Sequence, residues 1–197
     1  MLIKTSCSAV FGIKATTISV EVNVCPGLHY FMVGLPDNAV KESIQRVESA
    51  ISSSGFKMPR QKIIINLAPA DIRKEGSSYD LAIAIAVLGA SHQIPSENLN
   101  KYLILGELSL DGKIQPVKGV LPIAIQAKID NFVGIILPEE NAEEAAIVAG
   151  IEVYGVKSLL DTIEFLKGML QIKCTTVNIS EKFEKLLSNY ELDFADR

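Results

Sequence analysis

The chain has 197 residues, of which 48% are hydrophobic, and this is enough for one domain with a sizeable core. Its 19 basic and 23 acidic residues leave a net charge of -4, so the overall basic footprint of many nucleic-acid-binding proteins is absent and any such contact must come from a local patch. No apolar run approaches the roughly 20 residues that a membrane span needs. We therefore expect a cytoplasmic protein without membrane contact.

The cysteines do not predict a metal site. Cys7, Cys25 and Cys174 follow no metal-binding spacing, and only His29 and His92 could assist them. We therefore expect buried, reduced thiols and no bound metal.

The N-terminal part changes from β structure to helix. Residues 2–33 predict three strands, which we expect to form a meander of hairpins, because Thr17–Val24 alternates apolar and polar residues. Helical spacing of apolar residues begins at Asn38. Asp37 or Asn38 can cap this helix, and Gly55 stands where it should end.

The stretch 66–90 is the centre of the sequence. A β-rich run, 61–67, leads into a polar loop, and the apolar segment Leu81–Ala90 follows. Four alanines and a length of ten residues favour a buried helix for that segment. A loop between a strand and a helix is a common place for a functional site. The polar residues of interest there are Asp71, Lys74, Glu75, Ser77, Ser78 and Asp80.

The second half alternates strands and helices. Strands are expected at 102–107, 133–137 and 152–156, and a hairpin around Asp111-Gly112. Helices are expected from Pro122 to about residue 129, over 138–146, and from a Ser158 cap to about residue 167. This alternation predicts a partly parallel sheet covered by helices, and the fold class is α+β with a mixed sheet. Residues 173–179 predict an edge strand, and Ser180 begins a short amphipathic helix.

Two kinds of chemistry stay open. The chain has no phosphate-binding or dinucleotide-binding glycine motif, so we do not expect it to hydrolyse a nucleotide by itself. A serine beside a desolvated lysine can act as a nucleophile with its base, and Ser77 and Ser78 could pair with Lys74 or Lys118. The simpler interpretation makes Ser78 the cap of the next helix and Lys118 a solvated loop residue.

A local basic face is the second candidate. It would consist of Lys41, Arg46, Lys57, Arg60 and Lys62. Such a face either contacts DNA or phosphate, or is a solvated rim.

Several motifs together resemble one family. They are Gly34-Leu-Pro-Asp37, Asn66-Leu-Ala-Pro-Ala-Asp71, Lys74-Glu-Gly76, Tyr79-Asp-Leu-Ala-Ile-Ala-Ile-Ala86 and Gly106-Glu-Leu108. They resemble the N-terminal domain of the ComM/YifB proteins, which are Mg-chelatase-like AAA+ ATPases. The resemblance covers about residues 1–168, and 169–197 is interpreted as a linker and short helix leading to an AAA+ module that this chain lacks.

The resemblance implies a fold and a role. The fold would be that of the Lon protease domain, of the ribosomal protein S5 domain 2 type. The whole protein would be a hexameric, ATP-driven motor acting on branched DNA in recombination or natural transformation. The missing module would bind ATP and magnesium, and this chain would hold no cofactor. It would serve assembly into a homo-oligomer and contact with DNA.

Comparison with Lon tests for proteolysis. Laid over Glu75–Asp80, the Lon nucleophile falls on Ser78. Counting on from Gly106–Gly112 places the Lon lysine at Leu121, and Lys118 stands three residues early, where we expect it not to reach the site. We therefore predict a non-proteolytic domain. The alternatives are a Ser/Lys peptidase using Ser78 and Lys118, and an interaction module without DNA contact.

Overall fold

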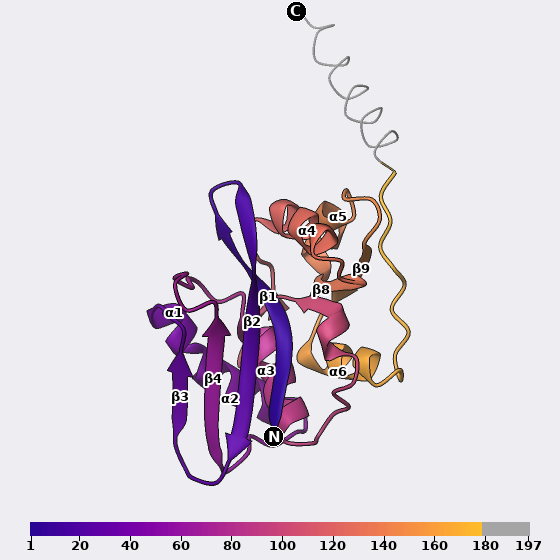
Figure 1. Cartoon of the computed structure of the whole chain (residues 1–197). Coiled ribbons are helices and arrows are strands. Elements are labelled where there is room, and N and C mark those ends of the chain that lie inside the picture. The colour runs from indigo at the N-terminus through magenta and orange to yellow at the C-terminus, as the bar shows by residue number, and fades with distance from the viewer. Residues whose placement is uncertain (179–197) are drawn as a thin grey trace, which may run out of the picture.

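The computed structural model describes residues 1–178, and a seven-stranded mixed sheet forms its centre (Figure 1). The strand order is β3-β4-β2-β1-β5-β8-β9. The strands of this sheet are β1 (Leu2–Phe11), β2 (Lys14–Cys25), β3 (Tyr30–Val33), β4 (Lys62–Ala68), β5 (Tyr102–Ile104), β8 (Gly134–Pro138) and β9 (Glu152–Val156). A separate hairpin joins β6 (Glu107–Leu108) to β7 (Ile114–Gln115). The helices are α1 (Asn38–Lys41), α2 (Ser43–Ser53), α3 (Asp80–Ala90), α4 (Val120–Ile129), α5 (Glu139–Ala145) and α6 (Leu159–Leu166), with a 3-10 turn at Leu99–Lys101.

The sheet mixes antiparallel and parallel pairs, so the predicted α+β class is confirmed. β1 pairs antiparallel with β2, and β2 pairs antiparallel with β4. The other four pairs are parallel: β3 with β4, β1 with β5, β5 with β8, and β8 with β9. The strand-helix alternation of the second half therefore predicted the parallel part correctly.

The predicted meander is wrong. β1 and β2 form a hairpin, but β4 lies between β2 and β3, and β3 runs parallel to β4. α1 and α2 connect β3 to β4, which is the crossover that a parallel pair needs. β4 buries Ile63, Ile65 and Leu67, whereas β3 has no fully buried residue and lies at the edge. Alternation alone could not rank these strands by depth.

α3 is the centre of the core. Every residue from Asp80 to Ala90 is buried, as the alanine-rich pattern predicted. The helix packs on β1 and β2, with α2 beside it, and Figure 1 shows it behind these strands. Thr5 of β1 donates a hydrogen bond to the carbonyl of Ala82 at 3.0 Å. Small side chains let the helix approach the sheet closely, and this fixes the loop that precedes it.

The helix expected from Asn38 is interrupted. Asp37 caps α1 by accepting a hydrogen bond from the amide of Val40 at 2.8 Å, as predicted, but α1 ends at Lys41 and α2 begins at Ser43. Gly55, with φ of 85°, follows the end of α2, also as predicted. The two helix ends could be predicted because each depends on a single residue, whereas the interruption between α1 and α2 could not.

The later elements agree with the sequence, apart from two strands. β5 ends at Ile104, because the chain turns at Gly106 toward the start of α3, where Gly106 donates to the carbonyl of Ser78 at 3.0 Å. The edge strand predicted from Lys173 is wrong for the described residues. Residues 171–178 have no regular structure, although the amide of Thr175 donates to the carbonyl of Val153 at 2.8 Å. The helix predicted from Ser180 lies outside the described residues.

Among the described helices, none combines the length and the apolar character that crossing a membrane requires.

Candidate functional site

The loop before α3 is held in place by the segment after β3. Lys74 exchanges backbone hydrogen bonds with this segment: its amide donates to the carbonyl of Leu35 at 3.0 Å, and its carbonyl accepts from Asp37 at 2.9 Å. The carboxylate of Asp37, besides capping α1, accepts from the amide of Gly76 at 3.2 Å. The motifs Gly34–Asp37 and Lys74–Gly76 are thus one structural unit, although about forty residues separate them.

Lys74 is a fully buried lysine. Its ammonium group donates a hydrogen bond to the carbonyl of Pro69, and its side chain forms no ion pair among the described residues. Burial lowers the pKa of Lys74, since the charged form loses its hydration. The position suits a brace within the loop. It does not suit a base for Ser77 or Ser78, because Lys74 does not line the cavity in which these serines lie.

Asp80 and Arg46 form a buried ion pair behind the loop. Arg46 donates to the two carboxylate oxygens of Asp80 at 2.6 and 3.0 Å, and the amide of Leu108 donates to the same carboxylate at 3.1 Å. Asp80 is fully buried. Burial raises the pKa of Asp80 to about 6, and Arg46 partly offsets this effect. The pair connects α2, α3 and the β6-β7 hairpin, and it gives Arg46 an intramolecular role.

A cavity of about 310 Å³ opens in front of the loop. Ser77, Ser78, Glu107 and Lys118 all line it. Lys118 thus shares this cavity with the serines, and the expectation that it does not act as their base stays a prediction. The residues between β7 and α4 run along the cavity wall, because Val117 is held by Asn141 of α5 through hydrogen bonds of 2.8 and 3.0 Å.

The hydrogen bonds of this cavity do not form a Ser/Lys dyad. Ser77 donates to the carboxylate of Glu107, and no hydrogen bond between Ser78 Oγ and Lys118 Nζ occurs within residues 1–178. Ser78 takes part through its carbonyl, which accepts from Gly106 at 3.0 Å and from the thiol of Cys7 at 3.6 Å. Burial raises the pKa of Cys7 to about 12, so this thiol is not a thiolate nucleophile at neutral pH.

Ser78 does not cap α3, contrary to the sequence interpretation. The residue at the N-cap is Tyr79, and no side chain accepts a capping hydrogen bond there. Leu121, at the position of the Lon lysine, lies in the first turn of α4, where its amide donates to Glu144 at 3.1 Å. The residue that occupies the base position is thus aliphatic and half-buried.

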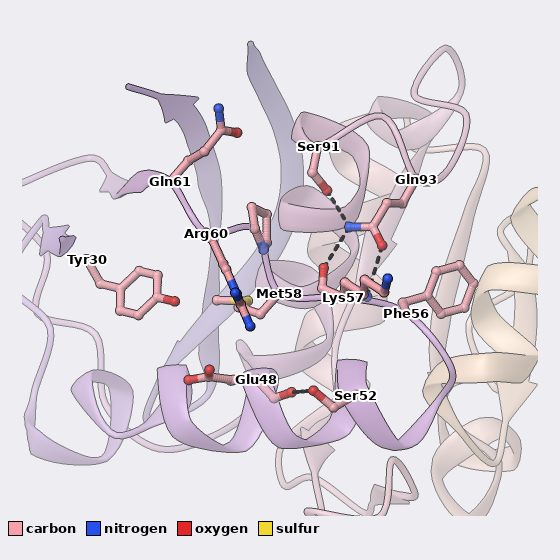
Figure 2. Close-up of a pocket in the computed structure, with 11 residues that line it drawn as sticks. Tyr30, Glu48, Ser52, Phe56, Lys57, Met58, Arg60, Gln61, Ser91 and Gln93 are labelled. Carbon is pink, nitrogen blue, oxygen red and sulfur yellow. Dashed lines mark hydrogen bonds between the residues drawn. The ribbon is translucent and has the colours of Figure 1, made fainter. Parts of the chain in front are cut away.

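The five predicted basic residues do not all share one environment. Arg46 is committed to Asp80, whereas Lys41, Lys57 and Arg60 are exposed and Lys62 is half-buried. Lys57 and Arg60 line a groove of about 930 Å³ beside α2 (Figure 2). Lys62 lies over the ring of Phe31, 5.0 Å from its centre.

No cluster of metal ligands is found in the part of the chain that the structure describes: no three His, Cys, Asp or Glu side chains lie close enough together to hold a metal ion. The three cysteines are free, with Cys7 buried and Cys25 and Cys174 partly exposed.

Comparison with known proteins identifies the family. Residues 20–141 match the family model described as subunit ChlI of Mg-chelatase. The chain is 37% identical over 189 residues to competence protein ComM of Haemophilus influenzae, which covers 95% of this chain and 37% of the relative. The chain belongs to the ComM/YifB family. It is also 43% identical over 161 residues to the uncharacterized protein YifB of Escherichia coli, covering 81% of this chain and 32% of that relative.

This ComM/YifB chain spans about a third of the length of those relatives. It is also 32% identical over 126 residues to Lon protease 2 of Bacillus subtilis, covering 63% of this chain and 22% of the protease. The Lon-like character predicted from the motifs is therefore confirmed, and the domain corresponds to a part of these longer proteins.

Sequence reasoning missed two residues of the site. Glu107 was noticed only as part of a motif, although it holds the Ser77 hydroxyl. Asp37 was seen as a helix cap, and its second bond to Gly76 was not anticipated. Both contacts join segments at least thirty residues apart, so neighbouring residues in the sequence could not reveal them.

Proposed function

We propose that this chain is the non-proteolytic, Lon-like domain of a longer ATP-driven motor of the ComM/YifB type, which acts as a hexamer on DNA in recombination or transformation. In that protein the domain serves ring assembly and contributes a DNA contact, and ATP and magnesium bind to the AAA+ module outside it. The observation that carries this proposal is the 37% identity to a competence protein over nearly the whole chain.

The lack of proteolysis rests on the cavity. A serine nucleophile needs a base within hydrogen-bond reach, about 2.6–3.2 Å. Here the hydroxyl of Ser77 is bound to the carboxylate of Glu107, and the position of the Lon lysine holds Leu121. The cavity is therefore a retained feature of the Lon-like fold in which the catalytic amine has been replaced.

The motor is tested with the full-length protein. ATP hydrolysis is measured with and without branched DNA, and the oligomeric state is measured by analytical ultracentrifugation in the presence of ATP and magnesium. We expect hydrolysis to rise with DNA and a hexamer to form, and Ser78→Ala to leave both unchanged. A monomeric protein whose ATP hydrolysis ignores DNA would refute the proposal.

A Ser/Lys peptidase is the second candidate, because Ser78 and Lys118 line the same cavity. In that reaction a neutral Lys118 would take the proton of Ser78 as its oxygen attacks the peptide carbonyl. A serine-directed fluorophosphonate would then label wild type, and Ser78→Ala or Lys118→Met would abolish labelling. We expect no labelling that depends on either residue.

A further inference from the structure

A groove lies beside β3, away from the cavity that Ser77, Ser78 and Lys118 line. The C-terminal half of α2, the loop 56–61 and Tyr30 surround it, and its volume is about 930 Å³. Figure 2 shows Tyr30 on one side, Phe56 on the other, and Arg60 with Met58 between them. A second hollow of about 230 Å³ is lined by Tyr30 again, with Phe31 and Lys41. The two hollows therefore share Tyr30 as a lining residue.

The cations along these hollows are free of carboxylate partners. The ion pairs within residues 1–178 use Lys4, Arg46, Arg73, Lys113 and Lys157. None uses Lys41, Lys57 or Arg60, which line the hollows, or Lys62, which lies over the ring of Phe31. A cation without a carboxylate partner keeps its charge for an anionic partner, and these four cations place positive charge around the edge strand β3 of a protein with a net charge of -4.

Two exposed aromatic rings lie beside these cations. Tyr30 and Phe31 are 41% and 46% exposed, and Lys62 stands over the Phe31 ring. Both belong to β3, whose outer edge pairs with no other described strand. Large exposed rings cost hydration free energy, and their concentration on one edge strand indicates that a partner covers them.

The loop that carries Lys57 is fixed in advance. The side-chain amide of Gln93 both accepts from the amide of Lys57 at 3.0 Å and donates to its carbonyl at 2.8 Å, and it also donates to Ser91 at 2.8 Å (Figure 2). The backbone is thus held while the charged side chain stays exposed. Little ordering entropy is lost when such a loop binds a ligand.

We propose that this basic-aromatic track, defined by Tyr30, Phe31, Lys41, Lys57, Arg60 and Lys62, binds single-stranded nucleic acid. Bases stack on Tyr30 and Phe31, and the cations contact the phosphates. A duplex keeps its bases stacked and would offer only phosphates to the rings. Glu48 also lines the groove and repels phosphate there, so the backbone must pass it on the side of Lys57 and Arg60. This inference rests on the DNA contact in the proposed function and specifies its substrate.

The test is fluorescence anisotropy of the 197-residue chain with labelled oligo(dT), oligo(rU) and a blunt hairpin duplex at 50–200 mM salt. Four phosphate contacts on a single strand predict a slope of about -3 in log K against log salt, or an affinity loss of about 50-fold over this range. Tyr30→Ala should weaken oligo(dT) binding about tenfold, and Tyr30→Phe should restore it, because the stacking surface remains. Comparing the affinities for oligo(dT) and oligo(rU) shows whether the bound single strand is DNA or RNA.

Matched controls separate the track from general charge. Lys57→Gln and Arg60→Gln should each reduce the salt slope by about 0.7. Lys113→Gln and Lys157→Gln change the net charge equally at exposed lysines that pair with Asp111 and Glu139, and they should leave binding unchanged. Circular dichroism confirms that each variant is folded.

Three results would overturn the track: no binding at 50 mM salt, equal losses in the control variants, or duplex binding as tight as oligo(dT) and indifferent to Tyr30→Ala. The motor is judged separately in the full-length protein. DNA-stimulated ATP hydrolysis that survives Tyr30→Ala refutes the track and supports the motor. Binding that needs Tyr30, together with ATP hydrolysis that ignores DNA, supports the track and refutes the motor.

Discussion

The buried pair of Arg46 and Asp80 makes a sharp prediction for stability. Replacing Arg46 with methionine keeps most of the side-chain volume and leaves a fully buried carboxylate without its cation. Breaking a buried ion pair from one side costs about 3–5 kcal/mol. Because Arg46 is 20% exposed and water can reach that end, we expect a loss of about 3 kcal/mol in the free energy of unfolding at pH 7.

The dependence on pH follows from the pKa of Asp80. The pKa of Asp80 is raised from 3.8 to about 6 in the native state. Between these pH values the native state therefore holds a proton that the unfolded state has released. The contribution of this group is therefore most favourable below about pH 4 and is lost as pH rises through 6. Without Arg46 the effect of burial is no longer offset and the pKa rises further. At pH 5 the carboxyl is neutral in both proteins, and the cost of Arg46→Met should fall to about 1 kcal/mol, the value of a lost hydrogen bond.

Urea unfolding at pH 7 and pH 5 measures both values. Arg46→Met with Asp80→Asn should recover most of the loss at pH 7, since no charge remains buried. Arg73→Met is the matched control, because Arg73 and Glu75 are 69% and 62% exposed, and it should change stability by less than about 1 kcal/mol. A cost of Arg46→Met that is equal at both pH values, or below about 1 kcal/mol at pH 7, would refute this electrostatic account.

Three further changes test the loop and its supports by urea unfolding. Lys74→Met should cost less than about 1.5 kcal/mol at pH 7, because it removes a buried charge at similar volume, and a larger cost would show that the hydrogen bond of Lys74 outweighs its desolvation. Wild type should gain stability relative to this variant as pH rises toward the ordinary lysine pKa of 10.5, since the pKa of Lys74 is lowered in the native state. Gly34→Ala should cost more than about 2 kcal/mol, because φ is 98° and a Cβ would lie 2.1 Å from the carbonyl oxygen of Leu67. Gly12→Ala is the control and should cost about 1 kcal/mol, because a Cβ there would have no atom within 4 Å. Equal costs for the two variants would contradict the clash at Gly34. Asp37→Ala should cost about 2 kcal/mol, since it removes both the cap of α1 and the bond to the loop, and a loss below about 0.5 kcal/mol would mean that neither bond stabilises the fold.

Local signals predicted the elements well, and the arrangement less well. The alanine content and length of α3, the cap at Asp37 and the turn at Asp111-Gly112 each depend on neighbouring residues, and each was found. The place of β4 between β2 and β3 depends on which strand buries more surface across the whole sheet. The resemblance to a family supplied the class of fold, but it did not by itself order these strands.

The candidate site shows the same limit. Counting residues placed Leu121 at the position of the Lon lysine, and the structure puts this residue in the first turn of α4. Counting could not show that Lys118 lines the cavity, because its position depends on the contact between Val117 and Asn141. Nor could it show that Arg46 is committed to Asp80, thirty-four residues away. Charge in the sequence does not reveal which cations are already paired.

The pairing of β1 with β5 has a consequence for the order of synthesis. Ser6 of β1 pairs with Leu103 of β5, so almost a hundred further residues must be synthesised before β1 can pair with β5. During that interval β1, β2, β3 and β4 have left the ribosome, but the edge of β1 that later pairs with β5 exposes unpaired backbone groups. Strands of other chains can pair with this edge and cause aggregation. Closure of so long a loop slows folding. A nascent chain of this protein should therefore depend on chaperone shielding until β5 emerges, and any shortened product that ends before residue 102 should aggregate.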